Sequence, residues 1–195
     1  YSQQLLHQGI GPGSTVAVAL DKNIELIPML LAVVQVGATY VPMDLSYPDD
    51  RLAFMLEDSQ ADVLVTLQSE APRFAIGNIL LVDALPELSE TLALPSVDAQ
   101  QIIYKLYTSG STGTPKAAQV YRHSFELLLQ SYQQQLQLTD SDNLLVISAL
   151  GFDLTQKNLF VALLAGATVV LHESEVYDPR EIATLIDEQN ISLIN

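Results

Sequence analysis

Short apolar runs of strand length alternate with longer helical patterns along most of this chain. Runs of this kind are TVAVAL (residues 15–20), ADVLVT (61–66) and NLLVIS (143–148), and a helical pattern follows the first and the last of them. Strands that alternate with helices are joined by crossover connections, which bring successive strands side by side in parallel. The alternation therefore predicts an α/β fold with layered, mostly parallel sheets flanked by helices.

Glycine, proline and capping residues give approximate bounds for the predicted helices. Asn23 is a predicted N-cap for a helix that ends at Gly37, with Pro28 tolerated near the first turn. A second helix covers residues 47–60. Residues 83–100 contain two prolines and little periodicity, so they predict an irregular connection.

Composition excludes several classes of function. The 195 residues include 23 Asp plus Glu against 8 Lys plus Arg, a net charge of −15, so we expect neither nucleic-acid nor membrane-surface binding. No cysteine is present, and no apolar run has the length of a membrane span. The three histidines lack metal-ligand spacing, so no metal site is predicted. The composition fits a cytoplasmic protein.

Residues 107–116 read YTSGSTGTPK and follow the apolar residues Ile102 and Ile103. Glycines allow successive backbone N–H groups to converge on one anion, hydroxyls add donors, and Lys116 adds a positive charge. No glycine precedes Lys116 and no Ser or Thr follows it, so this is not a Walker loop. The residues alone leave two interpretations open, a phosphate-binding loop and a surface turn.

Asp153 is the second candidate, because it lies between Phe152 and Leu154 in an otherwise apolar segment. A carboxylate that leaves water must be paired or hydrogen-bonded. Asp153 and Gln156 also have the spacing of a capping box. The pattern therefore favours a ligand for a cation and a helix cap about equally, and the two roles can coexist.

Three segments resemble one family of proteins. YTSGSTGTPK is similar to the phosphate-loop motif of the adenylate-forming enzymes. GATYVPMDLSYPDDRLAFMLEDSQADVLVT (residues 37–66) resembles a stretch that is typical of the adenylation domains of nonribosomal peptide synthetases. FDLTQKNLFVALLAGATVVL (152–171) resembles the helix and strand that follow the loop in those domains. The resemblance runs in register over residues 1–195.

This resemblance implies ATP-dependent activation of an amino acid as an aminoacyl adenylate, followed by transfer to the phosphopantetheine thiol of a carrier domain. It implies Mg²⁺ with ATP, and places the metal ligand outside this chain. Lys116 becomes the catalytic candidate, and Asp153 the partner of the substrate ammonium, with Phe152, Leu154 and Lys157 near the substrate. Residues implied to hold the ATP phosphates are Thr108, Ser109, Gly110, Ser111, Thr112, Gly113 and Lys116.

Some features depart from the family pattern. Ala117 stands where the family usually has glycine, which could alter the exit of the loop. The chain begins within a helical pattern and finishes near a strand pattern, so residues 1–195 are expected to be a fragment of the large N-terminal subdomain, accompanied by further synthetase domains. An alternative function is a non-catalytic, split or degenerate scaffold module. Lys157 could face either the substrate or solvent.

Overall fold

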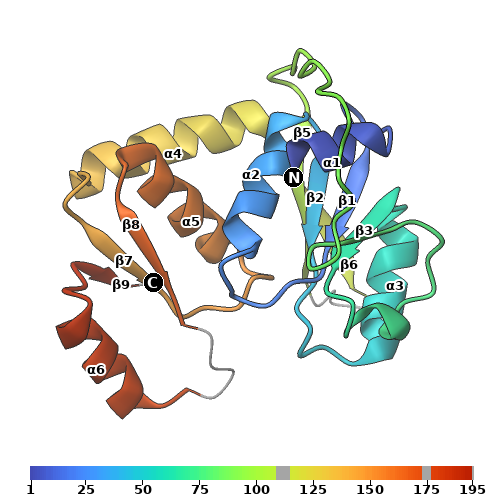
Figure 1. The fold of residues 1–195 in the computed structure, drawn as a ribbon. Helices are drawn as coiled ribbons and strands as arrows, with labels where there is room; N and C mark the ends of the chain where they lie inside the picture. Colours follow the sequence, from blue (N-terminus) through green and yellow to red (C-terminus); the bar gives the residue numbers. More distant parts are fainter. Residues whose placement is uncertain (109–114, 173–176, 195) are drawn as a thin grey trace. The chain divides into compact units, whose positions relative to one another are not determined.

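The computed structural model describes residues 1–108, 115–172 and 177–194. It divides into two compact units, Tyr1–His123 and Ser124–Asn195, and each unit is treated by itself below. The predicted α/β layering is confirmed in both, since each contains a sheet flanked by helices (Figure 1).

The first unit contains a six-stranded sheet with the order β4-β3-β1-β2-β5-β6. Neighbouring strands from β4 to β5 are parallel, whereas β5 and β6 form an antiparallel hairpin. The strands are β1 (Thr15–Val18), β2 (Thr39–Pro42), β3 (Val63–Thr66), β4 (Ile79–Leu81), β5 (Ile102–Thr108) and β6 (Lys116–Tyr121).

Helices α2 (Leu26–Gln35) and α3 (Asp49–Ser59) lie on opposite faces of this sheet (Figure 1). This placement follows from right-handed crossovers, because the chain steps from β1 to β2 in one direction and then back past β1 to β3. Leu52 and Met55 of α3 pack on Val41 and Leu64 in a buried apolar cluster. The unit also contains α1 (Ser2–His7) and a 3₁₀ turn, η1 (Ala71–Arg73).

The second unit contains a parallel three-stranded sheet with the order β8-β7-β9, made of β7 (Asn143–Val146), β8 (Thr168–Leu171) and β9 (Leu193–Ile194). Its helices are α4 (Arg122–Leu136, whose first two residues belong to the first unit), α5 (Asp153–Ala165) and α6 (Pro179–Glu188). Helix α4 packs along α5 through an edge-to-face contact of Phe125 and Phe160, with ring centroids 5.5 Å apart.

The predicted helix stop at Gly37 is confirmed, whereas the predicted helix start at Asn23 is wrong. Gly37 and Gly166 have φ values of +75° and +73°, the left-handed conformation that ends a helix at little cost for glycine. Helix α2 begins at Leu26 with Glu25 as its N-cap. Asn23 Oδ1 instead accepts the N–H of Glu25 at 3.0 Å, in a turn that precedes the helix. In the described residues, no helix has the length and apolar character needed to cross a bilayer.

Candidate functional site

The hairpin of β5 and β6 carries the two described ends of the predicted phosphate loop. Thr108 is the last residue of β5, Lys116 is the first of β6, and the two are directly paired across the antiparallel ladder. Side chains that face each other in such a pair lie on the same face of the sheet, and both side chains here are exposed. Five predicted loop residues lie outside the described part of the chain: Ser109, Gly110, Ser111, Thr112 and Gly113.

The parallel strands determine where this hairpin opens. Strand β5 pairs in parallel with β2, so Thr108 lies at the carboxyl edge of the sheet, and the antiparallel return of β6 puts Lys116 at the same edge. Open α/β sheets bind their ligands at this edge. The topology therefore places Thr108 and Lys116 where a ligand site is expected for such a sheet.

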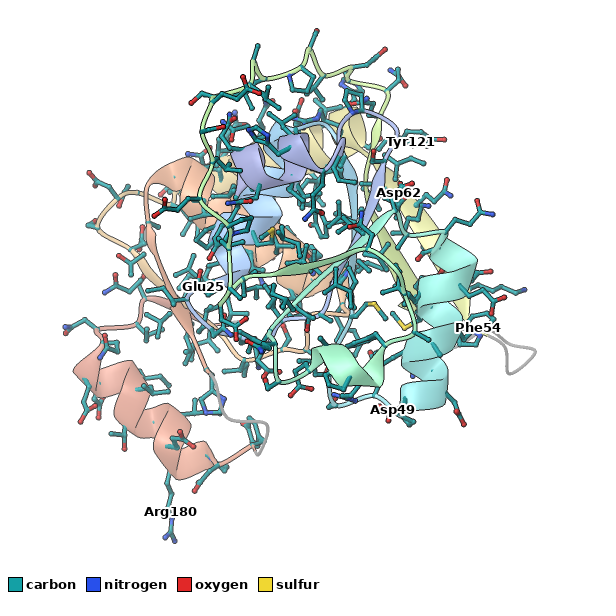
Figure 2. The ribbon with its side chains drawn as sticks, turned by 45° about the vertical axis from the view of Figure 1, so that its right-hand side comes forward. Glu25, Asp49, Phe54, Asp62, Tyr121 and Arg180 are labelled. Carbon is teal, nitrogen blue, oxygen red and sulfur yellow. The ribbon has the colours of Figure 1, made fainter. Side chains whose placement is uncertain are left out.

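Tyr107 fixes the strand just before the loop. Its hydroxyl donates a 2.7 Å hydrogen bond to Asp58 Oδ2 of α3. Its ring meets Phe54 edge to face at a centroid distance of 6.3 Å, and Phe54 projects from the middle of α3 (Figure 2). Burial, and then the hydrogen bond to Asp58, raise the pKa of the Tyr107 phenol well above its usual value of 10.0.

The structure accommodates Ala117 without backbone strain. In the described residues, the only non-glycine residues with positive φ are Gln60, Gln137 and Asn190, so Ala117 does not need a conformation reserved for glycine. Its methyl group packs against the buried cluster that contains Tyr107. The departure from the usual glycine is therefore compatible with the hairpin geometry.

Asp153 begins α5 in the second unit, and its surroundings differ from the prediction. The side chains of Asp153, Phe152 and Leu154 are exposed, the last two by 60% and 45%. Asp153 Oδ1 accepts the N–H of Leu154 at 2.7 Å, and Phe152 rather than Asp153 is the N-cap. The apolar enclosure and the capping box are therefore both wrong for the described structure, which leaves the carboxylate open to a ligand.

Hydrogen bonds from the first turn of α5 hold the preceding segment in place. Thr155 Oγ1 donates to Ala149 O at 2.7 Å, and Gln156 Nε2 donates to Leu150 O at 2.6 Å. Gln156 Nε2 thus anchors this segment to the start of α5. Sequence reasoning missed these positioning contacts, because the burial of Thr155 and Gln156, which requires hydrogen-bond partners, is visible only in the structure.

Lys157 lies one turn after Asp153, and its side chain is only 7% exposed. Its Nζ lies 3.4 Å from the ring centroid of Tyr132 on α4, within the range of a cation–π contact. The interpretation that Lys157 faces solvent is therefore wrong. Nothing in the sequence pattern singled out Tyr132 as its neighbour.

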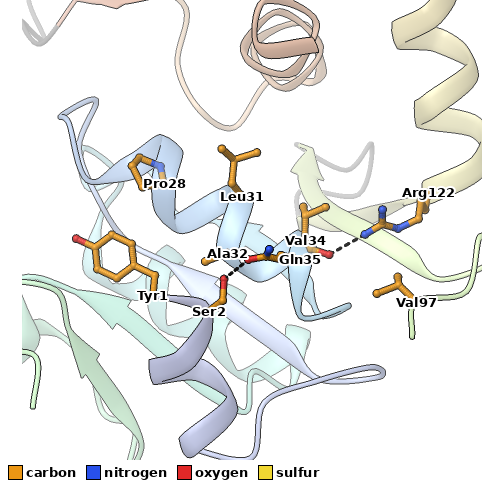
Figure 3. Close-up of a pocket in the computed structure, with 9 residues that line it drawn as sticks. All are labelled: Tyr1, Ser2, Pro28, Leu31, Ala32, Val34, Gln35, Val97 and Arg122. Atoms are coloured by element: carbon orange, nitrogen blue, oxygen red, sulfur yellow. Dashed lines mark hydrogen bonds between the residues drawn. The ribbon is translucent and has the colours of Figure 1, made fainter. Parts of the chain in front are cut away.

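The described residues contain no group of three or more His, Asp or Glu side chains that could hold a metal ion. A cavity of about 650 Å³ in the first unit is lined by parts of α1 and α2 together with Val97 and Arg122 (Figure 3). Arg122 Nη2 donates to Val34 O at 2.7 Å there. None of the predicted site residues lines this cavity.

Comparison with known sequences connects this geometry to one family. The sequence model described as "AMP-binding enzyme" matches residues 1–195. The chain is 36% identical to bacitracin synthase 1 of Bacillus licheniformis over 97% of its length and 4% of the relative. It is 34% identical to vanchrobactin synthetase VabF of Vibrio anguillarum, covering 98% of the chain and 7% of that protein. The chain thus spans only a small part of these relatives.

Solved structures give the same result at the level of the fold. The nonribosomal peptide synthetase FmoA3, in a form bound to α-methyl-L-serine-AMP, matches with a TM-score of 0.87 and 26% identity, over 97% of this chain and 22% of that one. An o-succinylbenzoate coenzyme A synthetase from Bacillus subtilis in complex with AMP matches with a TM-score of 0.87 and 25% identity, over 99% of this chain and 51% of that one. The resemblance to peptide synthetases is confirmed, and the fold is the same as in these two enzymes.

Proposed function

This chain belongs to the family of AMP-binding enzymes, and from that premise we propose that it is part of a ligase that activates an amino acid with ATP. An oxygen of the amino-acid carboxylate attacks the α-phosphorus of ATP, the bond from that phosphorus to the bridging oxygen breaks, and pyrophosphate leaves. The aminoacyl group of the adenylate then passes to the phosphopantetheine thiol of a carrier domain, and AMP is released. Residues 1–195 form the first part of the large subdomain in this proposal.

One observation carries the proposal: Thr108 and Lys116 face each other at the carboxyl edge of the parallel strands and enclose the SGSTGTP segment. In the described part of the chain Lys116 makes no ion pair, so its ammonium is available to phosphate oxygens. We assign the catalytic role to Lys116, and phosphate binding to the loop residues together with Thr108. Such a site acts through charge neutralisation and alignment of the reactants.

Asp153 completes the proposal as the ligand of the substrate ammonium. Its Oδ1 is held by the N–H of Leu154, whereas Oδ2 has no hydrogen bond to any described residue and is free to accept one. Phe152 and Leu154 are exposed beside it and can contact the rest of the amino acid. An acid without an ammonium would leave this carboxylate without its partner.

Mg²⁺ accompanies ATP in this proposal and screens the phosphate charge. The family resemblance implies that its protein ligands lie outside residues 1–195, and this stays part of the proposal. In this proposal the chain itself binds the ATP phosphates through the positive charge of Lys116, which the β5–β6 hairpin holds at the edge of the sheet.

The deciding experiment is amino-acid-dependent ATP–pyrophosphate exchange by the complete protein that contains this chain, with a panel of amino acids and their des-amino analogues. The proposal expects exchange with at least one amino acid and little with its analogue. Exchange with no acid at all, in a protein that melts cooperatively, would favour the alternative of a non-catalytic scaffold module.

A further inference from the structure

Arg51, in the first turn of α3, carries a charge to which the described residues give no counter-charge. Its guanidinium lies over the ring of Tyr47, 3.8 Å from the ring centroid, and its Nε is buried without a hydrogen-bond partner. In the described part of the chain the side chain makes no ion pair, although the sequence has 23 acidic residues against 8 basic ones. An unpaired buried donor costs free energy, and a stack on an aromatic ring compensates for only part of that cost.

Neighbouring residues hold Arg51 in place without neutralising it. Asp49, two residues earlier, is engaged by Arg73, whose Nη2 lies 2.8 Å from Asp49 Oδ1. The same Nη2 donates to the carbonyl oxygens of Leu45 at 3.1 Å and Tyr47 at 3.4 Å, which fixes the connection between β2 and α3. The Tyr47 ring is therefore a fixed platform, and the guanidinium above it is oriented in advance for an acceptor that the described residues do not supply.

The position of Arg51 on α3 indicates where that acceptor would lie. Phe54, three residues later and on the same side of the helix, meets the ring of Tyr107 edge to face. Asp58, about one further turn along, accepts the hydrogen bond from the Tyr107 hydroxyl. Because α3 is the return of a crossover from β2, it runs opposite to β2 and to the parallel strand β5. The step back from Phe54 to Arg51 therefore leads in the direction from Tyr107 to Thr108, toward the carboxyl edge of the sheet.

Thr108 and Lys116 face each other at this same edge. An arginine from α3 and a lysine from β6 thus lie toward one position, where a group with several anionic oxygens can satisfy both. A guanidinium binds two phosphate oxygens at once, whereas an ammonium acts as a point charge, so the two cations are complementary. Resting on the function proposed above, we propose that Arg51 is a second cationic ligand of the ATP triphosphate, at the phosphates that leave as pyrophosphate, and that Tyr47 is a positioning residue acting through it.

The test is ATP–pyrophosphate exchange by the complete protein, with the concentrations of ATP and of the amino acid varied in turn. Arg51→Gln removes the charge and should raise KM for ATP by about 10- to 150-fold, the usual effect of one lost charge-assisted hydrogen bond. KM for the amino acid should stay within about twofold of the wild type, because the lost contact belongs to the other substrate. Arg51→Lys keeps the charge without the planar fork and should recover part of the affinity. Arg180→Gln, the same change at an exposed arginine of α6 (Figure 2), is the matched control and should behave as the wild type.

A double-mutant cycle tests the role of Tyr47. Tyr47→Leu removes the platform and should raise KM for ATP more than it changes kcat, but should add little to the effect of Arg51→Gln when the two are combined. Additive effects would mean that Tyr47 does not act through Arg51. A folded Arg51→Gln protein with an unchanged KM for ATP would overturn the inference and leave the proposed function intact.

Two further measurements cover the remaining outcomes. Should Arg51→Gln not fold, the wild type decides: ATP should protect Arg51, but not Arg180, from modification by phenylglyoxal, as measured by mass spectrometry. Equal modification of Arg51 with and without ATP would overturn the inference. Absence of exchange with every amino acid would overturn the proposed function, and calorimetric titration with pyrophosphate then decides on Arg51. Weaker binding by Arg51→Gln than by the wild type would support it as an anion ligand, whereas equal affinity, or no binding by the wild type, would overturn the inference as well.

Discussion

The hydroxyl of Tyr107 donates a 2.7 Å hydrogen bond to Asp58 Oδ2, and this contact joins the strand that enters the loop to helix α3. Because the phenol is also buried, Tyr107→Phe should destabilise the protein by about 0.5–1.5 kcal/mol at pH 7, the usual net contribution of one hydrogen bond. Urea denaturation of both proteins measures this difference, and Tyr121→Phe at an exposed tyrosine is the matched control.

The same contact predicts an alkaline dependence of stability. The pKa of Tyr107 is raised in the folded protein, first by burial and then by Asp58, whereas the unfolded chain titrates near 10.0. A raised folded pKa contributes stability below the unfolded value, and this contribution falls as the pH rises above about 10. The free energy of unfolding should therefore fall more steeply between pH 10 and 12 in the wild type than in Tyr107→Phe. If the free energy of unfolding depends on pH in the same way in both proteins, Tyr107 is not the group responsible.

Lys116→Ala in the complete protein should lower the rate of pyrophosphate exchange by about 10- to 150-fold, which corresponds to about 1.5–3 kcal/mol for a lost charge-assisted contact. The melting temperature should stay the same, because the side chain is exposed. Lys116→Arg retains the charge and should recover part of the activity. An unchanged exchange rate in Lys116→Ala would remove this residue from the site.

Asp153→Ala should weaken activation of the amino acid by about 1.5–3 kcal/mol and largely spare its des-amino analogue, which brings no ammonium. Asp153→Asn separates charge from geometry, since its amide oxygen can still accept the N–H of Leu154. If Asp153 binds the substrate ammonium, the Asp153→Asn protein should be nearly as impaired in pyrophosphate exchange as the Asp153→Ala protein. Recovery of activity by Asn, or an equal loss for both acids, would assign Asp153 to the structure of the turn.

Ala117→Gly should restore the usual residue of the family without raising activity. Glycine in a strand costs about 0.5–1 kcal/mol, and the methyl contact with the buried cluster is lost as well. We therefore expect a lower free energy of unfolding in urea and an exchange rate within about twofold of the wild type. A large gain in exchange would mean that the alanine restricts the loop.

The sequence predicted element types well because each depends on local spacing, such as the apolar run of β1 or the glycine after α5. The N-cap at Asn23 was wrong because Asn can bond to the backbone in a turn as easily as at a helix start. The contact of Tyr107 with Asp58, and that of Lys157 with Tyr132, depend on how separate elements pack. No spacing within one element could have predicted them.

Strand β6 is an edge strand of its sheet, so the two ends of the loop, Thr108 and Lys116, differ in how firmly they are held. Strand β5 is bonded on both sides, by β2 and β6, whereas β6 pairs only with β5 in the described part of the chain. Strand β5 is thus held by β2 at Tyr104 and by β6 along the ladder, whereas β6 is held from one side only. Outward-facing amides of β6 should exchange with deuterium sooner than those of β5, and the lysine can shift toward a bound anion while the rest of the ladder stays intact.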